Sequence, residues 1–165
     1  MNSSAILALI YDEPSAAMVR PRLQTGVMSA VNYAEVIARL IERTLPLSEA
    51  IQLVAFLVLT VMDFTEARAA RSATLRPLTR SAGLSLADWA CLALDAELDA
   101  DVLAADRPWA TVEQVTGVRV VLIGCSLVWS SGSYFRADAY GACSVLIGAR
   151  KYFNFLKPRA RPSDR

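Results

Sequence analysis

The segment that decides the fold class is GLSLADWACLALDAELDADVLAAD, residues 83–106. Its Ser-Leu-Ala-Asp start, which ends at Asp88, is a capping-box pattern and predicts a helix over residues 85–98. The short apolar run that follows, residues 101–105, predicts a buried strand that ends beside the acid Asp106. A helix that leads directly into an apolar strand indicates an α/β domain.

The same alternation of helix and strand continues on both sides of this segment. We predict the end of a strand running into a helix at residues 3–9, a short apolar stretch at 26–29, helices at 30–44, 47–57 and 65–80, and strands at 58–63 and 117–123. These strands are apolar throughout, which is typical of a parallel sheet covered on both faces. We therefore expect an α/β/α domain with a ligand site at the carboxyl ends of its strands.

The composition limits the chemistry that this chain can perform. Its 165 residues are enough for one domain with a sizeable core. It contains no histidine, which excludes Ser-His-Asp and Cys-His nucleophile systems and every histidine-containing zinc site. Its three cysteines form no CxxC pair and are too few for a zinc site of four thiolates. Catalysis by this chain would therefore depend on carboxylates, hydroxyl groups or a metal held by oxygen.

The sequence predicts neither an export signal nor a membrane span. The opening stretch, residues 1–14, has no basic region ahead of its short apolar part. The longest apolar run, residues 50–62, is interrupted by Gln52 and is shorter than the roughly 20 residues that a span needs. Since the cysteines also make a poor disulfide framework, we expect a cytoplasmic protein.

We divide the chain into a domain over residues 1–124 and a C-terminal extension over residues 125–165. The domain carries a net charge of −4, whereas the extension carries +5 and both lysines. The extension is either an ordinary addition to the domain or a segment that was not selected together with it. Its basic end either contacts RNA or is simply solvated.

Polar residues at or near the predicted strand-to-helix junctions are the candidates for a functional site. They are Asn2, Glu35, Asp88 and Asp106. Each has a purely structural alternative. Glu35 shares the polar stripe of its helix with Asn32, Asp88 is placed to cap a helix, and Asp106 is placed to serve in a turn. A further group of acids is expected to form solvated surface: Asp95, Glu97, Asp99 and Asp101.

Four stretches together resemble one protein family. They are NSSAILALI at residues 2–10, MSAVNYAEVIARL at 28–40, GLSLADWACLALDAEL at 83–98 and DVLAADRPWA at 101–110. In this order and spacing they resemble PIN-domain toxins of the VapC family. The resemblance covers about residues 2–124 and does not extend to the C-terminal extension.

The resemblance implies a three-layer PIN-like domain with a central parallel sheet. It also implies a metal-dependent endoribonuclease, the toxin half of a type II toxin–antitoxin pair. By position, Glu35, Asp88 and Asp106 match family acids that hold Mg²⁺ or Mn²⁺, cations that prefer oxygen ligands. Ser4 matches a hydroxyl that positions the metal or its water.

Two departures from the family pattern bear on activity. The fourth metal-binding position is Asn2, where the family has an aspartate, and an amide brings no negative charge to the site. Only Met1 precedes this position, so we expect a truncated first strand. The alternatives are a catalytically impaired relic and an antitoxin- or RNA-binding module whose acids are structural.

The partners that the resemblance implies are a VapB-like antitoxin and an RNA substrate. We expect the antitoxin to bind an apolar groove between helices around residues 36–57. A homodimer is a further expectation from the family, and no membrane contact is expected.

Overall fold

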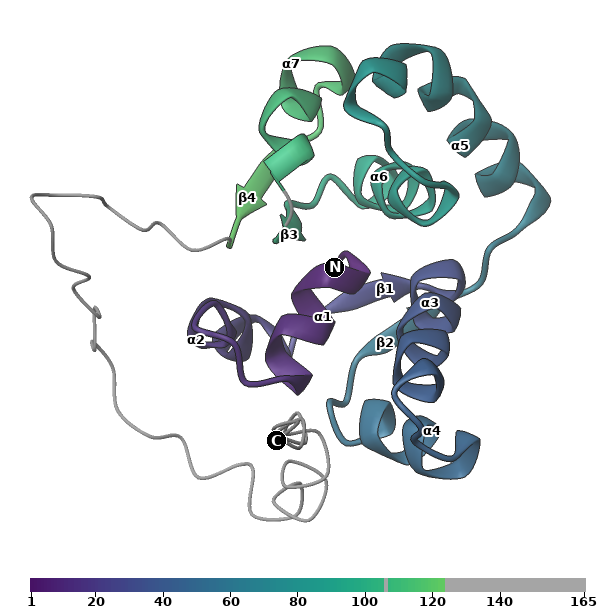
Figure 1. Cartoon of the computed structure of the whole chain (residues 1–165). Helices are drawn as coiled ribbons and strands as arrows, with labels where there is room; N and C mark the ends of the chain where they lie inside the picture. Colours follow the sequence, from purple (N-terminus) through teal and green to yellow (C-terminus); the bar gives the residue numbers. More distant parts are fainter. Residues whose placement is uncertain (106, 124–165) are drawn as a thin grey trace, which may run out of the picture.

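The computed structural model describes residues 1–105 and 107–123 as helices that alternate with short parallel strands, an α/β fold (Figure 1). The helices are α1 (Ser3–Ile10), α2 (Ala16–Val19), α3 (Ala30–Glu42), α4 (Leu47–Ala55), α5 (Glu66–Thr79), α6 (Leu86–Leu98) and α7 (Val112–Thr116). The strands are β1 (Val27–Ser29), β2 (Thr60–Met62), β3 (Val102–Ala104) and β4 (Val120–Leu122). Short 3-10 helices occupy Arg20–Arg22, Arg80–Ala82 and Arg107–Thr111. The extension at 125–165 lies outside the described residues.

The strands form two separate parallel pairs. In the first pair β1 lies beside β2, with Val27 opposite Thr60. In the second pair β3 lies beside β4, with Val102 opposite Val120. The predicted parallel pairing is thus confirmed for both pairs. Within residues 1–105 and 107–123, however, the four strands do not join into one sheet.

The first two residues of the sequence connect the two pairs. The Met1 amino group donates to the carbonyl of Val27 in β1, with the two atoms 2.6 Å apart. The Asn2 N–H donates to the carbonyl of Leu103 in β3, at 3.0 Å. Consecutive N–H groups of an extended chain point in opposite directions. The N–H groups of Met1 and Asn2 can therefore reach the strand pair on either side of them. This bridge fixes Asn2 between β1 and β3, at the start of α1.

The helix ends agree with the capping signals in the sequence. Ser85 and Asp88 form the predicted capping box at the start of α6. Gly83, whose φ of 65° lies in the left-handed region, ends the preceding 3-10 turn. These local interactions satisfy backbone groups that a helix end leaves free, and they set where α6 begins.

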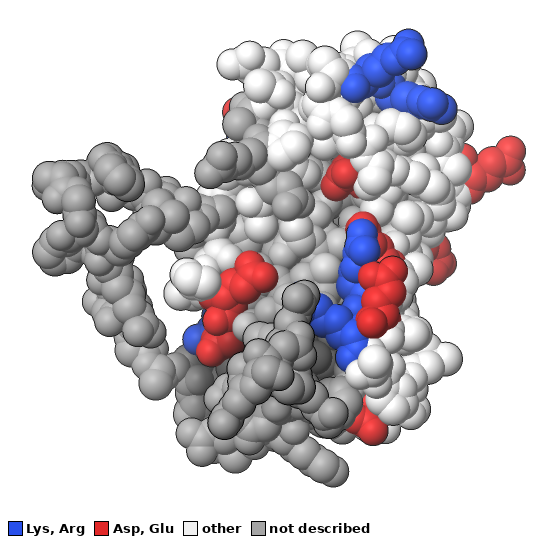
Figure 2. Space-filling model, in the orientation of Figure 1, with Lys and Arg blue, Asp and Glu red and all other residues white. Residues whose placement is uncertain are grey.

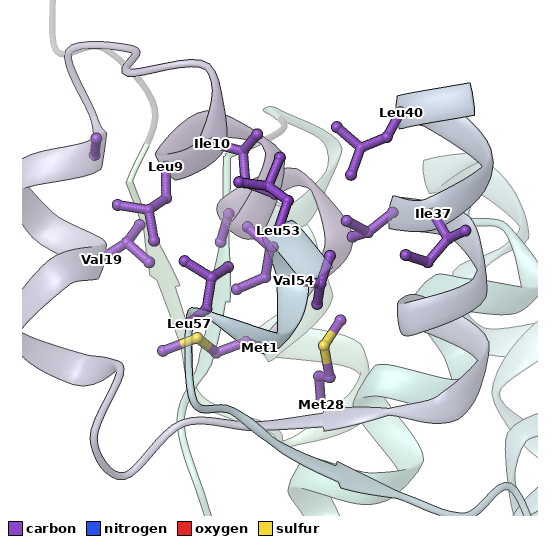
Figure 3. Packing of buried hydrophobic residues seen from close by; sticks show 14 of the residues in the cluster. Met1, Leu9, Ile10, Val19, Met28, Ile37, Leu40, Leu53, Val54 and Leu57 are labelled. Carbon is purple, nitrogen blue, oxygen red and sulfur yellow. The ribbon is translucent and has the colours of Figure 1, made fainter. Parts of the chain in front are cut away.

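Two apolar clusters stabilise the domain. The larger one contains side chains from all four helices α1, α2, α3 and α4. Figure 3 shows side chains from these helices, such as Leu9 and Leu53, converging with Met1 and Met28. The smaller one packs α6 against β3 and α7 around the buried ring of Trp109. Burying these side chains contributes about 25 cal/mol for each Å² of apolar surface removed from water.

Strand β2 departs from the sequence prediction of a buried strand. Its Thr60 and Val61 side chains are exposed, whereas its partner β1 is largely buried. Val58, just before it, has a left-handed φ of 55° and is 80% exposed. The apolar run at 58–63 therefore lies at the surface rather than in the core.

Helix α6 occupies the middle of the domain. It packs against α5, α3, β1 and β3, and consecutive residues Ala90 to Leu94 are all buried. A helix that is apolar on all sides is expected to be buried. Even so, within the part of the chain that the structure describes, no helix has the length and apolar content to cross a membrane. Because α6 lies in the middle of the domain, Asp88 in its first turn lies next to Asn2.

Candidate functional site

Asn2 is the N-cap of α1 and is almost fully buried, with 2% of its surface exposed. Its side-chain oxygen Oδ1 accepts hydrogen bonds from the Ser4 backbone N–H and from Ser4 Oγ, each at 3.0 Å. The Ser4 N–H can only donate, so the cap fixes which end of the amide faces the helix. The amide nitrogen Nδ2 must therefore point away from α1.

The Asn2 amide nitrogen points at Asp88. Nδ2 donates to Asp88 Oδ1 at 2.8 Å, across 86 positions in the sequence. The sequence placed both residues among the site candidates, and the structure brings them into direct contact. A hydrogen bond to a carboxylate is shorter and stronger than one between neutral groups.

The other oxygen of Asp88 is used by its own helix. Oδ2 accepts from the Ser85 N–H and from Ser85 Oγ, each at 2.8 Å. The structural alternative for Asp88, a helix cap, is therefore correct, and the contact with Asn2 is additional to it. Both carboxylate oxygens have protein partners.

Ser4 links this contact to the end of β3. Its Oγ donates to Asn2 and accepts a hydrogen bond from the Ala105 N–H at 3.0 Å. Ala105 directly precedes Asp106 in the sequence. Asp106 itself lies outside the described residues, so its predicted role stays a prediction. The sequence candidates Asn2, Ser4 and Asp88 do form one hydrogen-bonded network, which we call the Asn2 network together with Ser85 and Ala105.

Glu35 lies on α3 and is partly exposed. Within residues 1–105 and 107–123, the structure shows no hydrogen bond or ion pair that joins its carboxylate to the Asn2 network. It lies three positions beyond Asn32, so both residues lie on neighbouring parts of the same helix surface. Glu35 is therefore on the helix next to the network but not part of it.

Asn32 was expected on the solvated stripe of its helix, and this expectation is wrong. Its side chain is fully buried, and Nδ2 donates to Ser3 Oγ at 3.0 Å and to the Ala87 carbonyl at 3.1 Å. It thereby joins α3 to the first turns of α1 and α6. The sequence offered one signal, an amide flanked by apolar residues in a first turn, but this signal does not distinguish a buried amide from an exposed one.

The residues of the Asn2 network do not fit a divalent cation as they stand. Among the described residues, no group of three or more His, Cys, Asp or Glu side chains could hold a metal ion. Asn2 presents an N–H donor towards Asp88, whereas Mg²⁺ requires oxygen lone pairs. Its amide oxygen is already committed to the cap of α1. At Asn2 the observed network therefore presents an N–H donor where the predicted Mg²⁺ or Mn²⁺ site would need a ligand oxygen.

Asp95 was expected to be solvated, and this expectation is also wrong. Only 3% of its surface is exposed, and Oδ2 accepts a hydrogen bond from Cys91 Sγ at 3.1 Å. Burial raises the pKa of Asp95, and the Met1 ammonium partly opposes this rise. Burial also raises the pKa of the Cys91 thiol, so this thiol is poorly suited to act as a nucleophile.

A surface hollow of about 430 Å³ lies at the end of β2, away from the Asn2 network. Its lining includes Arg68, which makes two hydrogen bonds to Glu97 and one to the Asp63 carbonyl. Its charges are thus largely paired within the protein. In the middle of the face shown in Figure 2, basic and acidic side chains likewise lie side by side, and the described residues form no broad basic patch on this face.

Comparison with known proteins identifies no relative. No family model matches the chain, and neither a curated protein nor a solved structure is significantly similar to it.

Proposed function

We propose that this chain is a VapC-like PIN domain, built on the scaffold of a metal-dependent endoribonuclease toxin from a type II toxin–antitoxin pair. The observation that carries the proposal is the convergence of Asn2, Ser4 and Asp88 at one place between the two strand pairs. Asn2 and Ser4 lie together at the start of α1, Asp88 comes from the start of α6, and each matches a site position of the family. Ligand sites of parallel α/β folds lie at such strand ends.

The arrangement of the strands supports a three-layer PIN-like fold. Met1 and Asn2 bond to β1 on one side and to β3 on the other, which is how the last residues of a central parallel strand would bond. A strand in this position would give the order β2, β1, central strand, β3, β4. In Figure 1, α1 runs from this point between the two strand pairs.

A second candidate function is a catalytically impaired domain that still binds an antitoxin or RNA. The hydrogen bond from Asn2 to Asp88 favours it, because an amide N–H occupies one carboxylate oxygen of Asp88 in the observed structure. The predicted antitoxin groove covers residues 36–57. It has exposed apolar side chains that a partner could cover: Ile41, Leu47, Ile51 and Phe56.

Cleavage of RNA by the purified chain separates these two functions. We would compare the unaltered chain with Asn2→Asp, in Mg²⁺, in Mn²⁺ and with a chelator. If the scaffold is a ribonuclease, restoring the carboxylate should increase metal-dependent cleavage by on the order of 100-fold, the scale on which single electrostatic groups act in active sites. Growth arrest on induction in a bacterial host gives a second readout.

Helix α3 offers both a test position, Glu35, and a matched control position, Glu42. Glu35→Gln in the Asn2→Asp background should abolish the gained cleavage, as should Asp106→Ala. Glu42→Gln should leave it unchanged, because Glu42 is exposed at the far end of α3 and pairs with Arg39 on the surface of the same helix. If a folded Asn2→Asp chain cleaves no RNA with either metal, the ribonuclease proposal is wrong.

A further inference from the structure

Asn2 and Asp88 are arranged as two nearly equivalent halves of one contact. Each side chain uses one oxygen to accept hydrogen bonds at the start of a helix, Asn2 at α1 and Asp88 at α6. Each then presents its second polar atom to the other, and these two atoms, Asn2 Nδ2 and Asp88 Oδ1, are 2.8 Å apart. The contact is favourable only because one of the two atoms is an N–H donor.

The 2.8 Å separation also has a meaning for cation binding. Mg²⁺ binds oxygen at about 2.1 Å in an octahedron, so two adjacent ligand oxygens lie about 2.9 Å apart. With an aspartate at position 2, two carboxylate oxygens would face each other at nearly this spacing. Without a cation between them, two like charges at this distance repel each other in this partly buried contact.

We propose that the Asn2 amide takes the place of a divalent cation, so that the Asn2 network folds independently of metal, and that Asn2→Asp alone makes the fold depend on Mg²⁺. The amide nitrogen supplies the positive end of a dipole to Asp88 Oδ1 and leaves no lone pair directed into the contact. Whether this network needs a metal ion thus depends on one atom, which is the Nδ2 donor of Asn2 or the carboxylate oxygen that would replace it. This goes beyond the proposed ribonuclease function, since it concerns folding and needs no RNA substrate.

Thermal unfolding of the full chain, with a chelator and with Mg²⁺ alone, tests the proposal. The unaltered chain should show the same Tm in both conditions. Asn2→Asp should lower the Tm by about 5–10 °C with the chelator, because a partly buried hydrogen bond becomes a repulsive contact. Millimolar Mg²⁺ should recover most of this loss, since a ligand that binds only the folded state stabilises it.

The reversed pair Asn2→Asp with Asp88→Asn is the matched control. The amide at position 88 would then donate to the carboxylate at position 2, and both helix caps would keep an oxygen. The reversed pair should therefore be more stable than Asn2→Asp alone with the chelator and should lose its response to Mg²⁺. A response to Mg²⁺ as large as that of Asn2→Asp would contradict the proposal.

Direct binding keeps the proposal testable if Asn2→Asp does not fold without metal. Titration of the unaltered chain with Mn²⁺, followed by electron paramagnetic resonance, should show no saturable site in the range where refolded Asn2→Asp binds the ion. Equal binding by both chains would overturn the proposal. If the Mg²⁺ response appears but no RNA is cleaved, the proposal stands and the ribonuclease function fails.

Discussion

At the scale of single residues, the sequence does not distinguish polar side chains that are buried from those that are exposed. Asn32 and Asp95 were both expected at the surface, yet both are buried and hydrogen-bonded. Each lies in a helix that packs against other helices and strands on several sides. A polar residue in such a helix therefore need not face solvent. The Asn32 amide nitrogen finds its partners on α1 and α6, whereas Asp95 accepts from Cys91 one turn earlier in its own helix. The other polar atom of the Asn32 side chain, Oδ1, is buried without a hydrogen-bond partner among the described residues.

Asp95 gives a prediction about pH. Because its pKa is raised in the folded state, the folded protein binds this proton more tightly than the unfolded chain. Its contribution to stability is complete below the ordinary aspartate pKa of about 3.9 and is lost as the pH rises through the folded value. Asp95→Asn should therefore raise stability at neutral pH and flatten this part of the pH profile, measured by urea unfolding.

The control for this experiment is Asp63→Asn at an exposed position. It should change the stability much less than Asp95→Asn does. If Asp95→Asn is less stable than the unaltered chain at neutral pH, the attraction between Asp95 and the Met1 ammonium outweighs the cost of burial, and the prediction is wrong.

At the scale of elements, helix starts were the most predictable features. The capping box of α6 appears where the local sequence places it, and α3 begins at Ala30 as predicted. These signals depend on residues within three or four positions of one another, so the chain does not need to be folded for them to act. Helix α2 and the 3-10 turn after β3 were not predicted because no periodic pattern of that length stands out from a loop.

The capping box predicts a measurable local stabilisation. Ser85→Ala removes the side chain that accepts from the Asp88 N–H and donates to Asp88 Oδ2. We expect a loss of about 1 kcal/mol in the free energy of unfolding, the usual cost of losing an N-cap. Ser48→Ala, at an exposed position in the first turn of α4, should cost clearly less. Equal losses from the two substitutions would argue against a specific role for the box.

At the scale of the whole molecule, strand β3 couples the two apolar clusters. Leu103 packs in the larger cluster, while its neighbours Val102 and Ala104 pack in the smaller one. Side chains alternate across a strand, so three residues contact both sides of the domain. The two clusters are therefore expected to unfold together.

Leu103→Ala tests this coupling. Removing a buried leucine side chain should cost about 2–5 kcal/mol, and denaturant unfolding should remain a single transition at a lower midpoint. Leu122→Ala, at a partly exposed position in β4, is the matched control and should cost much less. Two separated transitions in the Leu103 variant would show that the clusters unfold independently.

The sequence by itself determined the class of elements, their order and most of their starts. Helical periodicity, capping residues and apolar strands are local properties, and they predicted parallel strands joined by helices. The sequence also placed Asn2 and Asp88 among the site candidates by their position at strand-to-helix junctions, and Ser4 through a family resemblance. Composition alone excluded histidine chemistry.

Only the tertiary structure decided what these candidates do to one another. The contact between Asn2 and Asp88 spans 86 positions, and it forms because the bridge of Met1 and Asn2 and the central position of α6 bring two helix starts together. Which end of the amide faces the carboxylate follows from the cap of α1, not from residue type. Burial, hydrogen-bond direction and charge balance arise from contacts between distant segments, and no local pattern in a sequence records them.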